Sequence, residues 1–277
     1  MTPLPAAAAL RVACIQMCSG DDVDANLART EELLGKAAGQ GADLALLPEN
    51  FAFMSADDAA RRTVAEPEAK SRILDFLSRR AREHSLAVIG GSIALAHAGS
   101  AKIRNTCPVY SHRGELLGLY DKMHLFDVDL EGESYRESDV IVPGDIPLSV
   151  NVKGWNIGLS ICYDIRFPEL YRYYADTECH AASIPAAFTV PTGMAHWETL
   201  LRARAIENQI YVLAAGQWGS HPGGRETWGH SMIVDPRGDV LAKKEEGDGV
   251  IVADLEMKFL QRVRRSLPAL QHRRKIG

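Results

Sequence analysis

Apolar positions in the N-terminal third of the chain predict three strands separated by two helices. Residues 10–17 alternate and are rich in β-formers, residues 43–47 are a short apolar run, and residues 86–94 indicate a third strand. Helical periodicity fills the segments between them, one starting at Asp24, which can cap a helix, and one at Pro67. Because strands alternate with helices, we expect a mostly parallel sheet with ligand-binding groups at the carboxyl ends of its strands.

The rest of the chain is richer in strands. Three predicted hairpins and two further strands outnumber what one small sheet needs, so we predict an α/β fold with two sheets packed face to face and helices outside. The hairpins cover residues 105–120, 148–161 and 232–243, and the strands at 181–188 and 210–217 flank a helix at 194–208.

No linker or fixed-period repeat interrupts this pattern. We therefore predict a single domain over residues 1–277, with a core at about 10–255. Residues 256–277 are predicted to form a C-terminal tail or subunit contact. The basic residues of this tail favour a solvated face or subunit contact over an anionic partner; they are Arg262, Arg264, Arg265, His272, Arg273, Arg274 and Lys275.

Composition narrows the class of protein. At 277 residues, 46% hydrophobic and 24% charged, the chain has the composition of a globular protein with a large core. Its net charge of −5 argues against nucleic acid as a partner, and no apolar run is long enough to cross a bilayer, so we expect no membrane partner. The first ten residues do not resemble a signal peptide, and five cysteines without framework spacing indicate a reducing compartment, so we expect a cytoplasmic protein. Cys14 and Cys18 lack a nearby Cys/His pair, which argues against a zinc site.

The strongest chemical signal lies in residues 155–170, W-N-I-G-L-S-I-C-Y-D-I-R-F-P-E-L. The apolar first half predicts a buried strand, and the second half predicts a helix with Pro168 in its first turn. Cys162 stands at the junction, where the N–H groups of a helix start would favour a thiolate and the oxyanion of a bound carbonyl. The alternative is that Cys162 is a small core residue, as most free cysteines are.

A cysteine hydrolase also needs a base for the thiol and a donor for the oxyanion. Glu49, after Pro48 at the end of an apolar strand, can accept and return a proton, and Lys122 after the strand at 117–120 can hold an oxyanion. Taken alone, each is more often a solvated surface charge. Together with a cysteine at a third strand end, they form a charge-balanced site. No histidine has a spacing that singles it out; the candidates are His84, His124, His196 and His230.

The segment at residues 122–144 is long and polar. Loops of more than about 15 residues inside a domain are usually functional or disordered, so we expect a lid or a solvated loop here. Its charged residues are Asp127, Asp129, Glu131, Glu133, Arg136, Glu137 and Asp139.

Three motifs, in this order, resemble the carbon–nitrogen hydrolases of the nitrilase superfamily. They are L-L-P-E-N around Glu49, Y-D-K-M-H-L-F-D around Lys122 and G-L-S-I-C-Y-D-I-R-F-P-E-L around Cys162, and the resemblance runs from about residue 11 to residue 274. It implies an α-β-β-α sandwich whose subunits pack in pairs, and it implies Glu49 as general base, Lys122 as oxyanion stabiliser and Cys162 as nucleophile. The backbone N–H of Tyr163 would be a second oxyanion donor.

The same resemblance assigns a second glutamate. Glu137 in Y-R-E-S matches the family's residue that helps orient the site, whereas Glu131 and Glu133 match less well. The implied chemistry is hydrolysis of a linear amide through a thioester, and it requires no metal or organic cofactor.

Three further stretches most resemble the deaminated glutathione amidase branch of the superfamily, although the ω-amidase branch shares much of their pattern. They cover residues 186–209, 229–238 and 271–274. The implied substrate carries a carboxylate at each end, so it needs cationic or N–H donors at both ends. The candidate donors and walls are Arg166, Phe188, Thr189 and His196, with Arg136 as a further candidate. The alternative for Arg166 is a salt bridge to Asp164 or Glu169.

Two other classes of function compete with the amidase. A papain-like protease would need a histidine aligned on Cys162, and a catalytically silent interaction protein with the same fold would not need Glu49, Lys122 and Cys162 together.

We also expect a homodimer or larger even assembly, because the predicted helix at 167–174 carries Tyr171, Tyr173 and Tyr174 on what should be an outer face.

Overall fold

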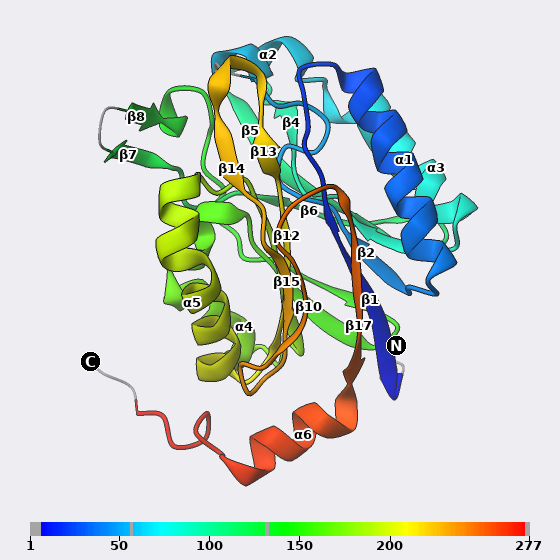
Figure 1. The fold of residues 1–277 in the computed structure, drawn as a ribbon, viewed down its shortest axis with the longest axis vertical. Helices are drawn as coiled ribbons and strands as arrows, with labels where there is room; N and C mark the ends of the chain where they lie inside the picture. The colour runs from blue at the N-terminus through cyan, green and yellow to red at the C-terminus, as the bar shows by residue number, and fades with distance from the viewer. Residues whose placement is uncertain (1–6, 56–57, 131–132, 275–277) are drawn as a thin grey trace.

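Two sheets lie face to face, with helices on the outer face of each (Figure 1). The computed structural model describes residues 7–55, 58–130 and 133–274. Within these residues the first sheet has seven strands in the order β17-β1-β2-β3-β5-β4, with β6 pairing with β5. Its strands are β1 (Ala9–Gln16), β2 (Leu44–Leu46), β3 (Ala87–Ile89), β4 (Ile93–Ala96), β5 (Ile103–Tyr110), β6 (Leu116–Asp121) and β17 (Gly249–Glu256).

The second sheet follows the order β16-β15-β12-β11-β10-β9. Its strands are β9 (Ser149–Val152), β10 (Trp155–Leu159), β11 (Ala181–Ala186), β12 (Tyr211–Gly216), β15 (Ser231–Val234) and β16 (Val240–Lys244). Strands β1, β2 and β3 are mutually parallel, as are β10, β11 and β12, whereas the outer pairs are antiparallel. The carboxyl ends of both parallel sets therefore supply positions for a site, as the sequence predicts.

Helices and two small hairpins complete the structure (Figure 1). The helices are α1 (Val23–Gly39), α2 (Arg61–Val64), α3 (Arg72–Glu83), α4 (Pro168–Asp176), α5 (Val190–Asn208) and α6 (Met257–Ser266). The hairpin strands are β7 (Asp127–Leu130) with β8 (Glu133–Arg136), and β13 (Trp218–Ser220) with β14 (Glu226–Trp228). Short 3-10 turns are η1 (Asp58–Ala60), η2 (Glu68–Lys70), η3 (Glu137–Asp139), η4 (Cys162–Arg166) and η5 (Pro222–Gly224).

Alternation along the strands builds the layers. In β1, Leu10, Val12 and Cys14 pack into the core between the two sheets, and Ala13 and Ile15 pack beneath α1 and α3. The second sheet does the same, with one face in the core between the sheets and the other beneath α4 and α5. Both faces of each central strand are buried, which explains the near-continuous apolar runs in the sequence. The predicted α-β-β-α sandwich is confirmed.

The first two helices begin at different residues than predicted. Asp22, not Asp24, caps α1, because its side chain accepts a hydrogen bond from the N–H of Asp24 at 2.9 Å. Helix α3 begins after Ser71, whose side chain caps it, so Pro67 precedes the short turn η2 instead of opening the helix.

The predicted strand at residues 86–94 is two strands, β3 and β4. The chain turns at Gly91, whose φ of +54° favours glycine. A Cβ at Gly91 would lie 2.0 Å from the carbonyl oxygen of Pro48, so the two backbones touch. This close approach sets the backbone immediately before Glu49.

The predicted outer aromatic face of α4 is largely buried. Tyr171 and Tyr174 are fully buried, and only Tyr173 is substantially exposed. Tyr171 hydrogen-bonds Ser160 at 2.8 Å, and the Tyr174 hydroxyl donates to the carbonyl oxygen of Leu159. Tyr171 and Tyr174 therefore support the strand that leads to Cys162. The prediction that all three tyrosines lie on an outer face is wrong, because two of them are buried within their own chain.

The C-terminal tail packs against its own chain. Helix α6 buries Leu260 and Val263, and the Arg264 side chain donates to the carbonyl oxygens of Cys179 and Gln209 at 2.8 and 3.1 Å. Arg264 is thus not part of a solvated basic face, and Lys275 lies outside the described residues. Over the described chain, no helix combines the length and apolarity needed to cross a membrane.

Candidate active site

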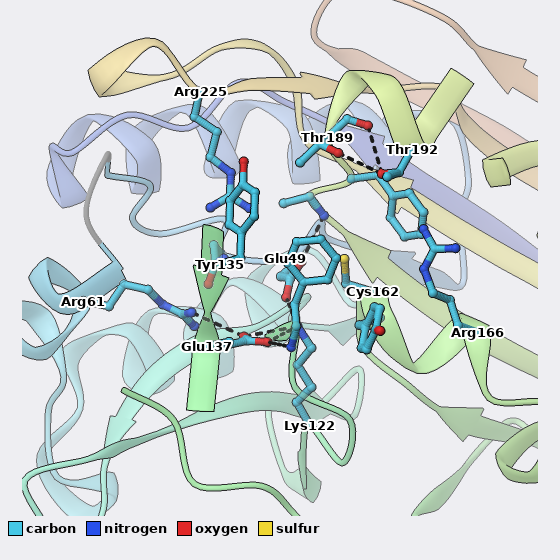
Figure 2. Close-up of a pocket in the computed structure, with 15 residues that line it drawn as sticks. Glu49, Arg61, Lys122, Tyr135, Glu137, Cys162, Arg166, Thr189, Thr192 and Arg225 are labelled. Carbon is cyan, nitrogen blue, oxygen red and sulfur yellow. Dashed lines mark hydrogen bonds and ion pairs between the residues drawn. The ribbon is translucent and has the colours of Figure 1, made fainter. Parts of the chain in front are cut away.

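Strand ends from both sheets bring Glu49, Lys122 and Cys162 into one pocket (Figure 2). Glu49 follows β2 after the Pro48 contact described above, Lys122 directly follows β6, and Cys162 opens η4 three residues after β10. More than 110 residues separate the first from the last along the chain, and the packing of the two sheets joins them. Glu137, the predicted second glutamate, lies at the start of η3 and lines the same pocket.

Lys122 lies between the two carboxylates. Its Nζ donates to Glu49 Oε1 at 3.1 Å and to Glu137 Oε2 at 2.8 Å, and all three side chains are buried. Burial alone would lower the pKa of Lys122, but the adjacent Glu137 and Glu49 charges outweigh it and raise that pKa. Burial would likewise raise the pKa of Glu137, but Lys122 and Arg61 lower it. The ion pairs therefore keep Lys122 and Glu137 charged at neutral pH.

Glu49 is held by two further donors that the sequence analysis missed. The Asn105 side-chain amide, from β5, donates to Glu49 Oε1 at 3.2 Å and to Glu137 Oε1 at 3.3 Å. The backbone N–H of Ala187, just after β11, donates to Glu49 Oε2 at 3.0 Å. These bonds aim the Glu49 carboxylate at the pocket. An asparagine within a predicted strand is the signal that could have identified Asn105, because a buried amide side chain needs hydrogen-bond partners.

Cys162 has a backbone conformation that is unusual for a side chain with a Cβ. Its φ is +48°, in the left-handed region, and the side chain is half-buried at the pocket floor. Burial raises the pKa of the Cys162 thiol, the Glu49 carboxylate raises it further, and Lys122 and the Ala187 N–H only partly oppose this. The resting thiol is therefore protonated. The expectation that N–H groups at this turn favour a thiolate is wrong, because burial and the Glu49 charge outweigh the groups that lower the pKa of the thiol.

Asp164 joins the Lys122 segment to the nucleophile turn. Its fully buried carboxylate accepts from the Tyr120 hydroxyl at 2.7 Å and from the His124 N–H at 3.0 Å, so it holds the residues two before and two after Lys122. The same carboxylate accepts from the N–H of Ile161, next to the nucleophile, at 2.8 Å. One side chain thereby sets the spacing between the ammonium and the thiol.

Histidines do not replace Glu49 as a base in the described structure. The residues that line the pocket include no histidine. His124 binds Asp164 through Nδ1 at 2.7 Å and stacks on Phe167 at 3.7 Å between ring centroids. A papain-like arrangement is therefore absent from the part of the chain that the structure describes.

The pocket above Cys162 encloses about 500 Å³, counting its open mouth. Beyond the catalytic cluster and Arg61, its walls include aromatic rings, hydroxyls and two further arginines: Phe126, Tyr135, Tyr163, Phe188, Thr189, Thr192, Arg166 and Arg225. In Figure 2, Arg166 and Arg225 lie on opposite sides of the pocket. This size and mixture suit a small polar ligand that is charged at both ends. Thr192, Arg225 and Arg61 are lining residues that the sequence analysis did not single out.

Arg166 faces the pocket with its charge uncompensated by a carboxylate. Its guanidinium lies over the rings of Phe188 and Tyr163, at 5.3 and 5.8 Å from the centroids, and its Nη1 is 3.3 Å from Nδ1 of His196. Among the described residues no carboxylate lies within ion-pair distance, so the alternative salt bridge to Asp164 or Glu169 is not formed. His196 is exposed and lies outside the pocket lining, where it contacts Arg166.

The described parts of residues 122–144 contain regular structure and are not a simple lid. They contain the hairpin β7–β8 and the turn η3, and they supply Phe126, Tyr135 and Glu137 to the pocket. Arg136 points elsewhere and pairs with Asp129 at 2.8 Å, so it does not line the pocket. Glu131 lies outside the described residues. Within the described residues, no group of three or more His, Cys, Asp or Glu side chains is arranged to hold a metal ion.

Comparison with known proteins agrees with this geometry. The sequence pattern of the carbon-nitrogen hydrolase family matches residues 11–265. The chain is 41% identical over 266 residues to a deaminated glutathione amidase of Synechocystis sp. (strain PCC 6803 / GT-S), covering 94% of this chain and 97% of the relative. It is 38% identical to the omega-amidase NIT2 of Mus musculus, covering 95% of each. Saccharomyces cerevisiae Nit3, a member of branch 10 of the nitrilase superfamily, superposes with a TM-score of 0.85 at 31% identity, over 95% of this chain and 96% of that one.

Proposed function

The chain belongs to the carbon-nitrogen hydrolase family, and from that premise we propose that it hydrolyses a linear amide through a thioester on Cys162. The observation that carries the proposal is the buried Glu49–Lys122 ion pair beside a protonated cysteine in a pocket open to ligand. A scaffold that only binds partners has no use for a buried, charge-balanced acid–base pair next to a strained thiol. This argues against the catalytically silent alternative.

In the first half of the proposed reaction, Glu49 takes the proton of the Cys162 thiol as the sulfur attacks the amide carbonyl carbon. The carbonyl electron pair moves to oxygen, and Lys122 Nζ and the backbone N–H of Tyr163 stabilise the resulting oxyanion. The intermediate collapses when the C–N bond breaks and Glu49 gives its proton to the departing amine. The product is a thioester between Cys162 and the acyl group.

In the second half, water attacks the thioester carbon and Glu49 takes a proton from that water. The C–S bond breaks, the acid leaves, and Glu49 returns the proton to the Cys162 sulfur. One carboxyl group thus acts as base and acid twice per turnover. The donors on both of its oxygens, from Lys122, Asn105 and the Ala187 N–H, hold it in one orientation for all four transfers.

We propose deaminated glutathione as the substrate, with α-ketoglutarate and cysteinylglycine as products. This compound has a carboxylate at each end, and the pocket offers Arg166 on one side of the nucleophile and Arg225 on the other. An arginine that stacks on aromatic rings is pre-organised for a carboxylate, because its fork of donors is already oriented. Phe188 and Thr189 would form the wall beside the scissile amide, and His196 would act through Arg166.

The substrate test compares deaminated glutathione with α-ketoglutaramate by mass spectrometry of the products. We expect a higher kcat/KM for deaminated glutathione, and no turnover of either compound by folded Cys162→Ala. Arg166→Gln should reduce kcat/KM for both substrates, whereas Arg225→Gln should reduce it only for the longer one. A higher kcat/KM for α-ketoglutaramate would favour the ω-amidase alternative, which the 38% identical omega-amidase relative supports.

A further inference from the structure

Arg61 is a buried cation at the edge of the catalytic cluster. It belongs to α2, is only 4% exposed and lines the pocket, with its guanidinium turned toward Glu137 (Figure 2). Its Nη1 lies 3.7 Å from Glu137 Oε1, which is an ion-pair distance and too long for a hydrogen bond. Within the described residues its Nη2 has no hydrogen-bond partner. Arg61 therefore interacts with Glu137 mainly through its charge.

The charges of the cluster balance only when Arg61 is counted. Glu49 and Glu137 are two buried anions, and Lys122 is a single buried cation between them. Without Arg61 the cluster has a net charge of −1 in a poorly solvated pocket, which is unfavourable and repels a carboxylate substrate. With Arg61 the sum is zero. Transfer of the Cys162 proton to Glu49 moves charge within the cluster and leaves that sum unchanged.

We propose that Arg61 is a positioning residue that keeps Glu137 ionised and thereby keeps Lys122 shared between the two carboxylates during turnover. The proposal rests on the catalytic roles assigned above to Glu49, Lys122 and Cys162. If Glu137 gained a proton, its lost charge would leave Lys122 attracted to Glu49 alone. The ammonium would then compete with the thiol for the Glu49 oxygens and draw away from the oxyanion.

The surroundings of Glu137 make the prediction specific. The charged groups that face it are Lys122 from β6, Arg61 from α2 and, across the lysine, Glu49. Among the described residues, the other groups that donate hydrogen bonds to its carboxylate are neutral, namely the Asn105 amide and the backbone N–H of Phe126. An opposite charge within about 4–6 Å lowers a carboxyl pKa by roughly 1–3 units, so loss of Arg61 should raise the pH at which Glu137 protonates.

The test is the pH dependence of kcat for Arg61→Gln, Arg61→Lys and the wild type. Because activity requires ionised Glu137, the acid limb of the Arg61→Gln profile should move upward by about one pH unit or more. Arg61→Lys keeps the positive charge, so the acid limb of its profile should lie close to the wild-type pH. Arg62→Gln is the matched control. Arg62 is an exposed arginine on the same helix, and within the described residues its guanidinium donates to the backbone carbonyl oxygen of Asp139. It should leave the limb in place.

Two results would overturn the proposal. The first is an Arg61→Gln variant whose kcat is lower by the same factor at every pH, with the acid limb at the wild-type pH. Arg61 would then have a structural role only. If Arg61→Gln does not fold, the double variant Arg61→Gln/Glu137→Gln tests whether the two charges compensate each other. Removing both charges should restore folding. A double variant that also fails to fold would contradict the proposal. Residual amidase activity in Cys162→Ala would instead refute the proposed reaction, whatever the Arg61 profiles show.

Discussion

Lys122→Met is the most informative single change, because it removes a buried charge and keeps the length of the side chain. In the wild type, Nζ lies 3.1 Å from Glu49 and 2.8 Å from Glu137, and the side chain is 2% exposed. Methionine fills the space but donates nothing. The buried carboxylates of Glu49 and Glu137 then remain with one cation in the cluster, Arg61, whose Nη1 lies 3.7 Å from Glu137 Oε1.

The structure separates two consequences of this change. The loss of an oxyanion donor should reduce kcat by on the order of 10²–10³. Removing one partner of a buried ion pair should also lower the free energy of unfolding by about 3–5 kcal/mol, because the remaining charges are left uncompensated. The double variant Lys122→Met/Glu137→Gln removes one charge of each sign. It should recover most of the stability and none of the activity.

The assays are steady-state release of the amine product and denaturant unfolding, both at pH 7. Unfolding should show Lys122→Met as much less stable than the double variant, while both have similarly low kcat. If Lys122→Met kept kcat within threefold of wild type and changed only KM, Lys122 would be a substrate-binding group instead of an oxyanion donor. If the double variant were no more stable than the single one, the charge-balance argument would be wrong.

Two further predictions concern the site, and a third concerns the assembly of subunits. Glu49→Gln should block acylation as well as deacylation, and mass spectrometry that detected the Cys162 thioester forming at the wild-type rate would contradict its role as base. Asp164→Asn replaces one of the two accepting oxygens by an NH2 group, which then opposes the N–H of either Ile161 or His124. We expect a loss of about 1–3 kcal/mol in unfolding free energy and at least a tenfold fall in kcat; an unchanged kcat would show that the four bonds of Asp164 do not set the site. We also propose a homodimer or larger even assembly, on the resemblance to the nitrilase superfamily alone, because Tyr171 and Tyr174 are buried within their own chain. A monomeric mass by light scattering at micromolar concentration would contradict it.

The layered fold was predictable because short-range patterns of apolar and polar residues indicate which faces of an element are buried. Strands buried on both faces are apolar runs, and the three hairpins carry turn residues between them. Two helix starts were misplaced by a few residues, because Asp22 and Ser71 are the caps. The break between β3 and β4 was missed because long-range packing decides it. Gly91 breaks a predicted strand because its backbone touches Pro48, and that contact cannot be read from either segment alone.

The site was predictable to the extent that its residues occupy strand ends. Glu49, Lys122 and Cys162 do so, and a motif marks each of them. The residues that hold these three side chains in place do not lie at strand ends. Asn105 lies within a strand, and Arg61 lies on a four-residue helix beside residues that carry no motif. Only the packing of the two sheets and of α2 brings these two side chains to the carboxylates.

The protonated state of Cys162 explains why so many charges surround it. Burial raises the pKa of the thiol, so the sulfur becomes nucleophilic only while Glu49 accepts its proton. A proton transfer that created net charge among these side chains would be costly, because they are buried. With two anions and two cations already paired, the transfer only moves negative charge from Glu49 to sulfur, next to Lys122. The same ammonium is then placed to hold the charge again when it reaches the substrate oxygen. The low solvation that makes the resting thiol inert thus strengthens the interaction that stabilises the transition state.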